Sequence, residues 1–332
     1  RRYYVDNLSA ALPPEKHLTD LQIQSVAIAR DTANEVYVGG GAFGVWASRD
    51  LASWFDLQFP DRHSFNPLQL VISPDFARDQ TIFATTGQGL YRSKGRPWKW
   101  EALPIGSGAD PTGAVAISPD FATDRALLVA GDNRRPGLRA SLDGGDTWTA
   151  VPAPAPITAS IGLRPFITPG GVWWAWIDYR GLYRSADRGQ TWTQLIDDQN
   201  AVAQSIAVSP AHARDGVIWI GVLGGSIYRT EDAGRTWVLS PLNLPPEDNW
   251  VRSLVFSPDF ASDRTVFAGT DNGLFRSRDA GATWTPIGVG RPLSAVAVSP
   301  AFAEDQTLLA ATADGDLSIS RDGGQSWGSV DH

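Results

Sequence analysis

The sequence predicts an all-β fold built from repeated four-stranded antiparallel units. The first observation is an eight-residue pattern, [ST]-x-D-x-G-x-[TS]-W, that ends in tryptophan. The second is its spacing, since the closing tryptophans recur every 43 to 48 residues, a period typical of repeated supersecondary units. The third is that each period holds four short β-rich runs separated by turn residues, with no helix-length apolar period. Seven such units predict a seven-bladed β-propeller of four-stranded blades.

Five copies of the pattern are complete, at residues 141–148, 185–192, 230–237, 277–284 and 320–327. Two upstream copies are degenerate, because residues 48–54 are one residue short and residues 93–100 carry Gly95 in place of the aspartate. The aspartates and tryptophans that we assign to this structural motif are Asp50, Asp143, Asp187, Asp232, Asp279, Asp322, Trp54, Trp100, Trp148, Trp192, Trp237, Trp284 and Trp327.

We interpret the motif as a structural hairpin staple. In the copy that ends at Trp284, Asp279 can accept backbone N–H groups of its own turn. Gly281 supplies a position with positive φ, and the indole of Trp284 can cover the turn and bury apolar area. Because the aspartate oxygens are committed to the turn, we expect no catalytic role for them.

At these residues the chain resembles the Asp-box propellers, whose motif is also called the bacterial neuraminidase repeat. Such motifs occur in sialidases, sortilin-type receptor ectodomains, xyloglucan-cleaving glycosidases and photosystem II assembly-factor-like proteins. In length, blade number and motif phrasing, the chain is most similar to the single-propeller assembly-factor-like and sortilin-like group. The resemblance implies the fold; it does not by itself imply a function, because one fold hosts many functions.

Composition narrows the classes of partner and cofactor. The 332 residues carry 28 Lys and Arg against 36 Asp and Glu, a net charge of −8, which argues against nucleic acid or anionic lipid as a partner. No apolar run approaches membrane-spanning length, so we expect no direct membrane insertion. The chain has no Cys, and its four His lack ligand spacing, so neither a metal site nor a cofactor is expected.

The absence of both Cys and Met suits oxidising or hot surroundings, since both side chains are oxidisable or thermolabile. The chain begins at Arg1 rather than Met, which fits a mature form from which a signal peptide has been removed; another trimmed boundary would look the same. We expect an extracytoplasmic location, either secreted or in the cell envelope.

We expect residues 21–332 to form a single propeller, preceded by an extension at residues 1–20 that lies outside the repeat. The extension could be an extra edge strand, a plug or an arm to a partner, and we favour a packed structural role. Blade 4 departs from the other blades, with residues 164–170 predicted to connect its first and second strands and residues 172–177 predicted as the second strand.

A second repeated phrase, S-P-D-F-A-x-D, predicts a fixed turn between the first two strands of several blades. Its aromatic residue is expected to fill the underside of the blade; these residues are Phe76, Phe121, Phe260 and Phe302. In blade 5 the same position holds His212, which we interpret as a structural residue rather than a metal ligand.

These regular turns predict which face of the ring binds. Connections between strands one and two, and between three and four, share one face of a propeller, so both repeated phrases lie together as scaffold. The opposite face carries irregular loops, where binding residues usually lie. The candidates there are Asp61, Arg62, Phe65, Arg134, Arg135, Asp178, Tyr179, Arg180, Asp198, Glu247, Asp248, Trp250 and Arg291.

This inventory permits a sugar platform with Trp250, Tyr179 or Phe65, a protein-binding face, or glycoside hydrolysis by two carboxylates. Sialidases are typically six-bladed and carry an early F-R-I-P signature, which this chain lacks; xyloglucan-type glycosidases use two facing propellers. We therefore predict a non-catalytic binding or scaffold module that presents the irregular face to a protein or a glycan. The alternative is a sialidase-like or xyloglucanase-like glycoside hydrolase or lyase. The oligomeric state is left open.

Overall fold

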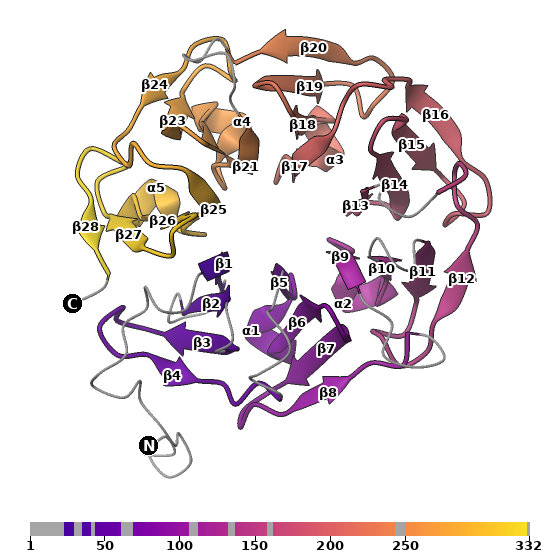
Figure 1. Cartoon of the computed structure of the whole chain (residues 1–332), viewed down its shortest axis with the longest axis horizontal. Helices are drawn as coiled ribbons and strands as arrows, with labels where there is room; N and C mark the ends of the chain where they lie inside the picture. The colour runs from indigo at the N-terminus through magenta and orange to yellow at the C-terminus, as the bar shows by residue number, and fades with distance from the viewer. Residues whose placement is uncertain are drawn as a thin grey trace.

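The computed structural model describes residues 23–29, 35–40, 44–60, 69–105, 112–131, 137–157, 162–242 and 250–330. Within these residues, seven four-stranded antiparallel sheets stand around a central axis (Figure 1). The predicted seven-bladed propeller is therefore confirmed. Each blade takes its four strands from consecutive stretches of the chain, in order from the axis outward. The predicted extension at residues 1–20 lies outside the described residues.

Blades 1 and 2 consist of β1 (Ile23–Ile28), β2 (Val36–Gly40), β3 (Val45–Ser48), β4 (Phe55–Asp56), β5 (Gln69–Ile72), β6 (Thr81–Thr86), β7 (Gly89–Lys94) and β8 (Trp100–Ala102). Blades 3 and 4 consist of β9 (Thr112–Ile117), β10 (Leu127–Gly131), β11 (Leu138–Ser141), β12 (Thr149–Val151), β13 (Leu163–Thr168), β14 (Val172–Ile177), β15 (Gly181–Ser185) and β16 (Thr193–Ile196). Blade 5 consists of β17 (Ala203–Val208), β18 (Ile218–Val222), β19 (Ser226–Thr230) and β20 (Val238–Pro241). Blades 6 and 7 consist of β21 (Val251–Phe256), β22 (Val266–Thr270), β23 (Gly273–Ser277), β24 (Thr285–Pro286), β25 (Leu293–Val298), β26 (Leu308–Thr312), β27 (Leu317–Ser320) and β28 (Gly328–Ser329).

The S-P-D-F-A-x-D phrase forms one helical turn between the first and second strands of five blades. These turns are α1 (Phe76–Asp79), α2 (Phe121–Asp124), α3 (His212–Asp215), α4 (Phe260–Asp263) and α5 (Phe302–Asp305). In α1 the Ser73 hydroxyl donates to Asp79 at 2.7 Å, and Asp79 accepts the backbone N–H of Thr81 at 2.9 Å. Among the described residues, no helix has the length and apolar character needed to cross a membrane.

The aromatic position of this phrase is buried, as predicted. Phe76, Phe121, Phe260 and Phe302 are all buried. His212 is also buried, and its Nδ1 lies 3.2 Å from the carbonyl oxygen of Val217. His212 therefore occupies the same buried position as the phenylalanines of the other blades.

Blade 4 differs from its prediction. Residues 164–170 were expected to connect two strands, but β13 (Leu163–Thr168) is the inner strand itself, paired with β14 from end to end. The turn falls at Gly170 and Gly171, both with positive φ. Pro165 made a strand hard to predict here, because proline has no N–H to donate to a neighbouring strand. The strand nearest the axis is, however, the first strand of its sheet and has a partner on one side only, where proline is tolerated. The second strand was predicted correctly.

The hydrophobic core is divided into seven clusters, and each cluster combines residues of two adjacent blades. Between blades 5 and 6, for example, the ring of Trp219 packs 5.3 Å from that of Phe256 and 6.5 Å from that of Phe260, measured between ring centroids. In the described part of the chain, each blade therefore buries its apolar side chains against the two neighbouring blades.

Among the described residues, the ring closes by side-chain packing and by one hydrogen bond between blades 7 and 1. Ile23 and Val38 of blade 1 share a cluster with Leu309 and Leu317 of blade 7. The Ser294 hydroxyl of β25 donates to the backbone carbonyl of Ile23 at 3.0 Å. Blade 7 has its own outer strand, β28, so its four strands are complete without a strand from the other end of the chain.

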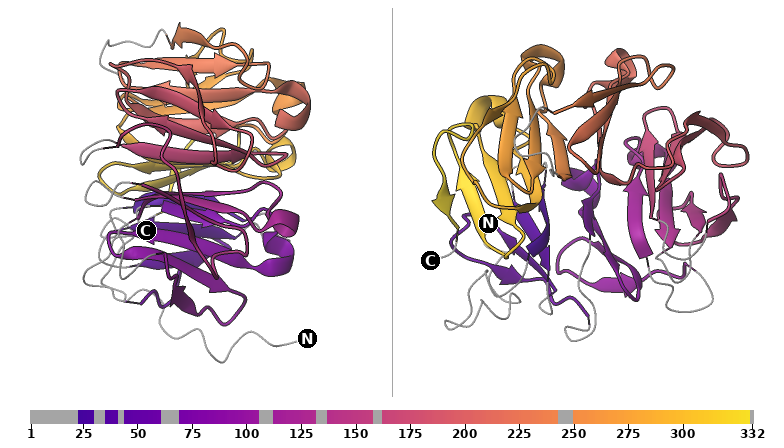
Figure 2. Two further views of the ribbon diagram at one scale, coloured as in Figure 1. Left: turned by 90° about the vertical axis from the view of Figure 1, so that its right-hand side faces the viewer. Right: turned by 45° about the horizontal axis from the view of Figure 1, so that its top comes forward.

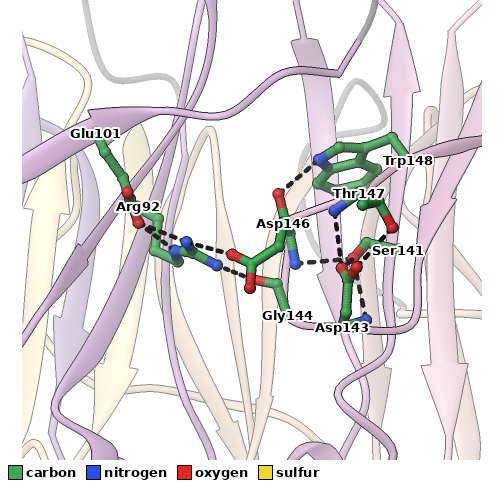
Figure 3. A network of polar contacts seen from close by, with 9 residues as sticks. Arg92, Glu101, Ser141, Asp143, Gly144, Asp146, Thr147 and Trp148 are labelled. Carbon is green, nitrogen blue, oxygen red and sulfur yellow. Dashed lines mark hydrogen bonds and ion pairs between the residues drawn. The ribbon is translucent and has the colours of Figure 1, made fainter.

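We call the eight-residue motif the box turn, and its aspartate is bound as predicted. Asp143 accepts the backbone N–H of Thr147 at 2.9 Å, the Thr147 hydroxyl at 2.5 Å and the Ser141 hydroxyl at 2.7 Å (Figure 3). The same three bonds recur at Asp187, Asp232, Asp279 and Asp322. Each carboxylate is thus committed to its own turn.

The box turns also join adjacent blades, a role that the motif does not predict. Each closing tryptophan belongs to, or packs against, the cluster between its own blade and the preceding one. The indole of Trp192 donates to the carbonyl of Pro152 in blade 3, at 2.9 Å. Arg92 of blade 2 reaches the box turn of blade 3, where it donates to the Gly144 carbonyl and to Asp146 (Figure 3).

The two faces of the ring differ as predicted. The short helices lie together on one face, as the left view of Figure 2 shows. The box turns lie on the same face: the residue that follows α4, Arg264, accepts the backbone N–H of Ala280 at 3.0 Å. The opposite face carries the connections between second and third strands and those between blades. We call it the irregular face.

Candidate functional site

The predicted binding residues that the structure describes lie in blades 4 to 7 on the irregular face. They are Asp178, Tyr179, Arg180, Asp198, Trp250 and Arg291. The remaining predicted residues lie outside the described residues; they are Asp61, Arg62, Phe65, Arg134, Arg135, Glu247 and Asp248.

Asp178 is a buried joint between blades 4 and 5, with 5% of its surface exposed. It accepts hydrogen bonds from the indole N–H of Trp176 at 3.1 Å and from the backbone N–H of Ala203, the first residue of β17, at 3.0 Å. The Arg164 guanidinium lies 3.1 Å from the same carboxylate. Burial raises the pKa of Asp178, although Arg164 opposes this shift. Its carboxylate oxygens are bonded to protein groups, so Asp178 holds blades 4 and 5 in position beneath the exposed residues of the site.

Tyr179, the next residue, is 50% exposed and has a left-handed backbone, with φ of 62°. Its N–H donates to the carbonyl of Ala201 at 3.0 Å, which fixes this conformation. For an L-residue the left-handed region costs roughly 1–2 kcal/mol. Blade 5 has a three-residue connection of the same length, and its middle residue is Gly224, with φ of 88°. Tyrosine therefore stands where the neighbouring blade uses glycine.

The non-glycine residues with positive φ, Tyr179 among them, separate into two groups. Most recur at equivalent positions, namely the residue after a short helix or the box turn; these are Gln80, Arg125, Arg264, Gln306, Leu51, Arg188, Ala233 and Ala280. The rest are Gln58, Tyr179 and Val289, and all three lie on the irregular face. Backbone strain that is not part of the repeat is thus confined, among the described residues, to this face.

Three exposed nonpolar side chains follow one another around this face in blades 4, 5 and 6. They are Tyr179, Leu223, which is 39% exposed, and Trp250, which is 37% exposed. We call them the apolar arc. The N–H groups of Tyr179 and Leu223 donate to the consecutive carbonyls of Ala201 and Val202, at 3.0 and 2.9 Å, so the two connections are neighbours.

The arc continues from blade 5 to blade 6. The Ser205 hydroxyl donates at 2.8 Å to the carbonyl of Val251, the residue after Trp250. Gly221, two residues before Leu223, is so close to Val251 that an added Cβ would lie 2.7 Å from its side chain. Leu223 was not predicted as a binding residue; the Leu-Gly-Gly sequence of its turn was the available signal, because two glycines leave the leucine unshielded.

Trp250 is held by a cation. The Arg252 guanidinium carbon lies 4.8 Å from the centroid of the Trp250 ring, and Arg252 is paired with Asp271. Arg252 is the extra residue of a β-bulge, since Val251 pairs with Thr270 and Ser253 with Gly269. A bulge redirects a side chain, and a cation over an indole contributes about 0.5–1 kcal/mol at an exposed site. The indole is therefore presented in a fixed orientation.

The other predicted residues divide into paired and unpaired groups. Although burial opposes it, hydrogen bonds from Tyr228 and from the backbone of Asn200 and Ala201 lower the pKa of Asp198. Arg291 pairs with both Asp314 and Asp316. Arg180, by contrast, is exposed and has no carboxylate within ion-pair distance among the described residues.

Four carboxylates of the irregular face are bound by other side chains of the protein. They belong to Asp178, Asp198, Asp271 and Asp314, and each accepts a hydrogen bond from a specific side-chain donor. The described residues contain no cluster of three or more His, Asp or Glu side chains suited to a metal ion. The described part of the site offers exposed aromatic and aliphatic surface, a free guanidinium and fixed hydrogen-bonding groups.

Comparisons with known proteins agree with the fold. A family model described as sortilin, neurotensin receptor 3, matches residues 180–287, which run from blade 4 to blade 6. The chain is similar to an ancestral GH74 enzyme, with a TM-score of 0.71, 16% identity, and coverage of 93% of this chain and 46% of the other. No curated protein sequence gives a significant match.

Two further solved structures are similar. The extracellular domain of the one-component system BT4673 from B. thetaiotaomicron aligns with a TM-score of 0.66 and 15% identity, over 90% of this chain and 38% of that chain. YCF48 from Cyanidioschyzon merolae aligns with a TM-score of 0.63 and 14% identity, over 91% and 95%. YCF48 has also been solved bound to D1 peptide, with a TM-score of 0.54 and 17% identity over 75% and 77%. The predicted resemblance to assembly-factor-like and sortilin-like propellers is confirmed at the level of the fold. The chain spans less than half of the BT4673 and GH74 structures.

Proposed function

We propose that this chain is a non-catalytic propeller module that binds a protein partner through the apolar arc of its irregular face. The observation that carries the proposal is Tyr179, an exposed aromatic side chain on a strained backbone where the adjacent blade has glycine. Strain that the fold does not need is typical of functional positions.

The chemistry of the arc suits protein recognition. Trp, Tyr and Arg are the residue types that dominate binding energy at protein interfaces, and Tyr179, Arg180 and Trp250 supply all three. Each large nonpolar side chain that a partner covers completely contributes on the order of 1.5–3 kcal/mol. The similar propeller YCF48 binds D1 peptide, which supports a peptide or protein as the class of partner.

The test is site-specific photo-crosslinking in cells of the source organism. A photoreactive phenylalanine at Tyr179 or Trp250 should cross-link to the same protein partner, because both face one interface. The control is the same residue at Leu142, which is 47% exposed but lies in a box turn on the opposite face. Equal cross-linking from Leu142, or no protein adduct from either arc position, would refute the proposal.

A glycan is the second candidate, because the Trp250 indole fixed by Arg252 offers a flat stacking surface. A glycan array probed with the wild-type chain and with Trp250→Ala tests it; only a signal that the substitution removes would favour this candidate. For the glycoside hydrolase or lyase alternative, the supporting result would be turnover of a glycan that Asp178→Asn abolishes while the variant keeps the melting temperature of the wild type.

We further propose that the protein works outside the cytoplasm. The support is compositional: 332 residues without Cys or Met remove the two side chains that oxidants modify most readily. Immunoblotting of cytoplasmic and extracytoplasmic fractions from the source cells tests this. Recovery with the cytoplasmic fraction would contradict it.

A further inference from the structure

We infer that the partner segment carries an acidic side chain next to the nonpolar side chain that contacts Tyr179, and that Arg180 receives its carboxylate. The inference rests on the proposed function and names the chemistry of its partner. It follows from the pairing of the charged side chains around the arc.

Arg180 differs from Arg164, Arg252 and Arg291, the arginines of this face that are paired with aspartates in the described part of the chain. Arg164 is paired with Asp178, Arg252 with Asp271, and Arg291 with Asp314 and Asp316. The positive charges of these three arginines are therefore already matched within the protein. Arg180 is exposed and has no carboxylate within ion-pair distance among the described residues, so its charge is available to a partner.

The backbone beneath Arg180 is fixed. Its N–H donates to the carbonyl of Ile177 at 3.0 Å, and its own carbonyl accepts the side-chain amide of Gln194 at 2.8 Å. Gly181, which follows, has φ of 97°, and a Cβ there would lie 2.1 Å from the Ile196 carbonyl oxygen. Because the backbone is already fixed, only the side-chain rotamers of Arg180 are ordered on binding, and the planar guanidinium then favours a specific ion pair over a diffuse attraction.

The net charge of the chain sharpens this preference. With a net charge of −8, the protein as a whole repels acidic segments. An acidic residue is therefore favoured only where an unmatched cation lies within reach, and Arg180 is adjacent to Tyr179 of the arc. Matching a nonpolar contact with a carboxylate beside it gives the interface both affinity and orientation.

A phage-displayed library of random peptides provides the probe. Selection on the wild-type chain should enrich peptides that carry Asp or Glu next to a large nonpolar residue. A selected peptide should bind Arg180→Glu roughly tenfold or more weakly, because the substitution replaces attraction by like-charge repulsion. The difference should shrink at about 0.5 M salt, since screening weakens exposed ion pairs.

The matched control is Arg188→Glu. Arg188 is also exposed and belongs to the same blade, but it lies in the box turn on the opposite face. Both variants change the net charge by the same amount, so a general charge effect would weaken both equally. Only a local pairing at Arg180 weakens one and spares the other.

The outcomes separate the inference from the proposed function. If Tyr179→Ala abolishes peptide binding while Arg180→Glu retains it, the arc binds a partner and the acidic preference is wrong. Selected peptides without enriched acidic residues would overturn the inference in the same way. If no peptide is enriched, or if Tyr179→Ala binds as well as wild type, both the inference and the proposed function fail. Enrichment of acidic glycans but not peptides on matched arrays would also overturn both.

Discussion

At the scale of the residue, Tyr179 separates what the fold needs from what binding needs. The fold needs a left-handed residue between Asp178 and Arg180, and glycine would serve, as Gly224 does in blade 5. Half of the tyrosine surface stays exposed to solvent, so much of the side chain adds no buried area to the blade. An exposed tyrosine on a strained backbone is therefore better explained by a partner than by stability.

This view predicts an unusual result for Tyr179→Gly. Relief of the left-handed strain, roughly 1–2 kcal/mol, offsets the entropy that glycine adds to the unfolded chain, about 0.5–1 kcal/mol. The free energy of unfolding should therefore change little or rise slightly, while partner binding is lost. Urea denaturation and a binding assay measure the two effects. Gly224→Ala is the control, because its Cβ would meet no atom within 4 Å. Left-handed strain of roughly 1–2 kcal/mol should appear, reduced by the entropy of about 0.5–1 kcal/mol that the unfolded chain loses with the glycine.

The box aspartates predict how stability depends on pH. Hydrogen bonds from Thr283 and Ser277 lower the pKa of Asp279 from 3.8 to about 2, and the same bonds in other turns lower the pKa of Asp187, Asp232 and Asp322 to about 2. A lowered pKa contributes stability that is complete above the unfolded value and disappears as the pH falls through the folded value. The free energy of unfolding should therefore fall between about pH 4 and about pH 2. Asp279→Asn should flatten this dependence, and an unchanged slope in urea titrations would contradict the assignment.

At the scale of the element, the box turn is as much a junction between blades as a hairpin. A Cβ on Gly281 would lie 2.5 Å from the ring of Trp219 in the preceding blade, and its φ is 82°. Equivalent approaches occur at Gly234 and Gly189, whose Cβ atoms would lie 2.4 Å from Trp174 and from Val151. The glycine of the motif is therefore required twice, by its backbone conformation and by the neighbouring blade.

Gly281→Ala should consequently destabilise the protein by more than strain alone. Left-handed strain contributes roughly 1–2 kcal/mol and overpacking about 1–3 kcal/mol. Gly328→Ala provides the contrast, because its Cβ would meet nothing within 4 Å in β28. Thermal and urea denaturation of both variants measure the difference. Similar stabilities for the two would show that the junction yields to the extra methyl group.

The outer strand of blade 5 gives a further prediction. After the closing tryptophan, blades 3 and 4 place Thr149 and Thr193, whereas blade 5 places Val238 and Leu239, which are both exposed. Nonpolar residues on an edge strand promote edge-to-edge association. Replacing both residues by Thr should leave the melting temperature unchanged and reduce light scattering at high protein concentration. Unaltered scattering would mean that this edge does not associate.

The sequence predicts the features that lie within one repeat, but it does not predict the contacts between repeats. The blades and the aspartate bonds follow from residues within one period, so spacing alone was sufficient. Two features depend on contacts between adjacent blades, and the sequence of a single repeat does not specify such contacts. They are the packing of Trp219 against Phe256 of the next blade and the hydrogen bond that Ala203 of blade 5 donates to Asp178 of blade 4. Leu223 could not be predicted as a binding residue, because a single leucine in a loop carries no signal by itself. Only the fold places it between the exposed side chains of Tyr179 and Trp250.

At the scale of the whole molecule, the junction between blades 7 and 1 is built like the other six. Leu317 of β27 is buried there, and Leu274 of β23 is its equivalent between blades 6 and 7. We expect Leu317→Ala and Leu274→Ala each to cost about 2–5 kcal/mol, because both leave a cavity in a packed cluster. Both variants should unfold in one transition by calorimetry. A much smaller loss for Leu317→Ala would show that the ring is weaker where it closes.

The consecutive order of strands in every blade has a consequence for how such a molecule can change. One uninterrupted stretch of chain forms one blade, so exchanging a single sequence repeat replaces one whole blade and removes no strand from the neighbouring blades. Recombination could in this way alter the side chains shown to a partner piece by piece, while the glycine and tryptophan contacts that seat each blade are inherited intact.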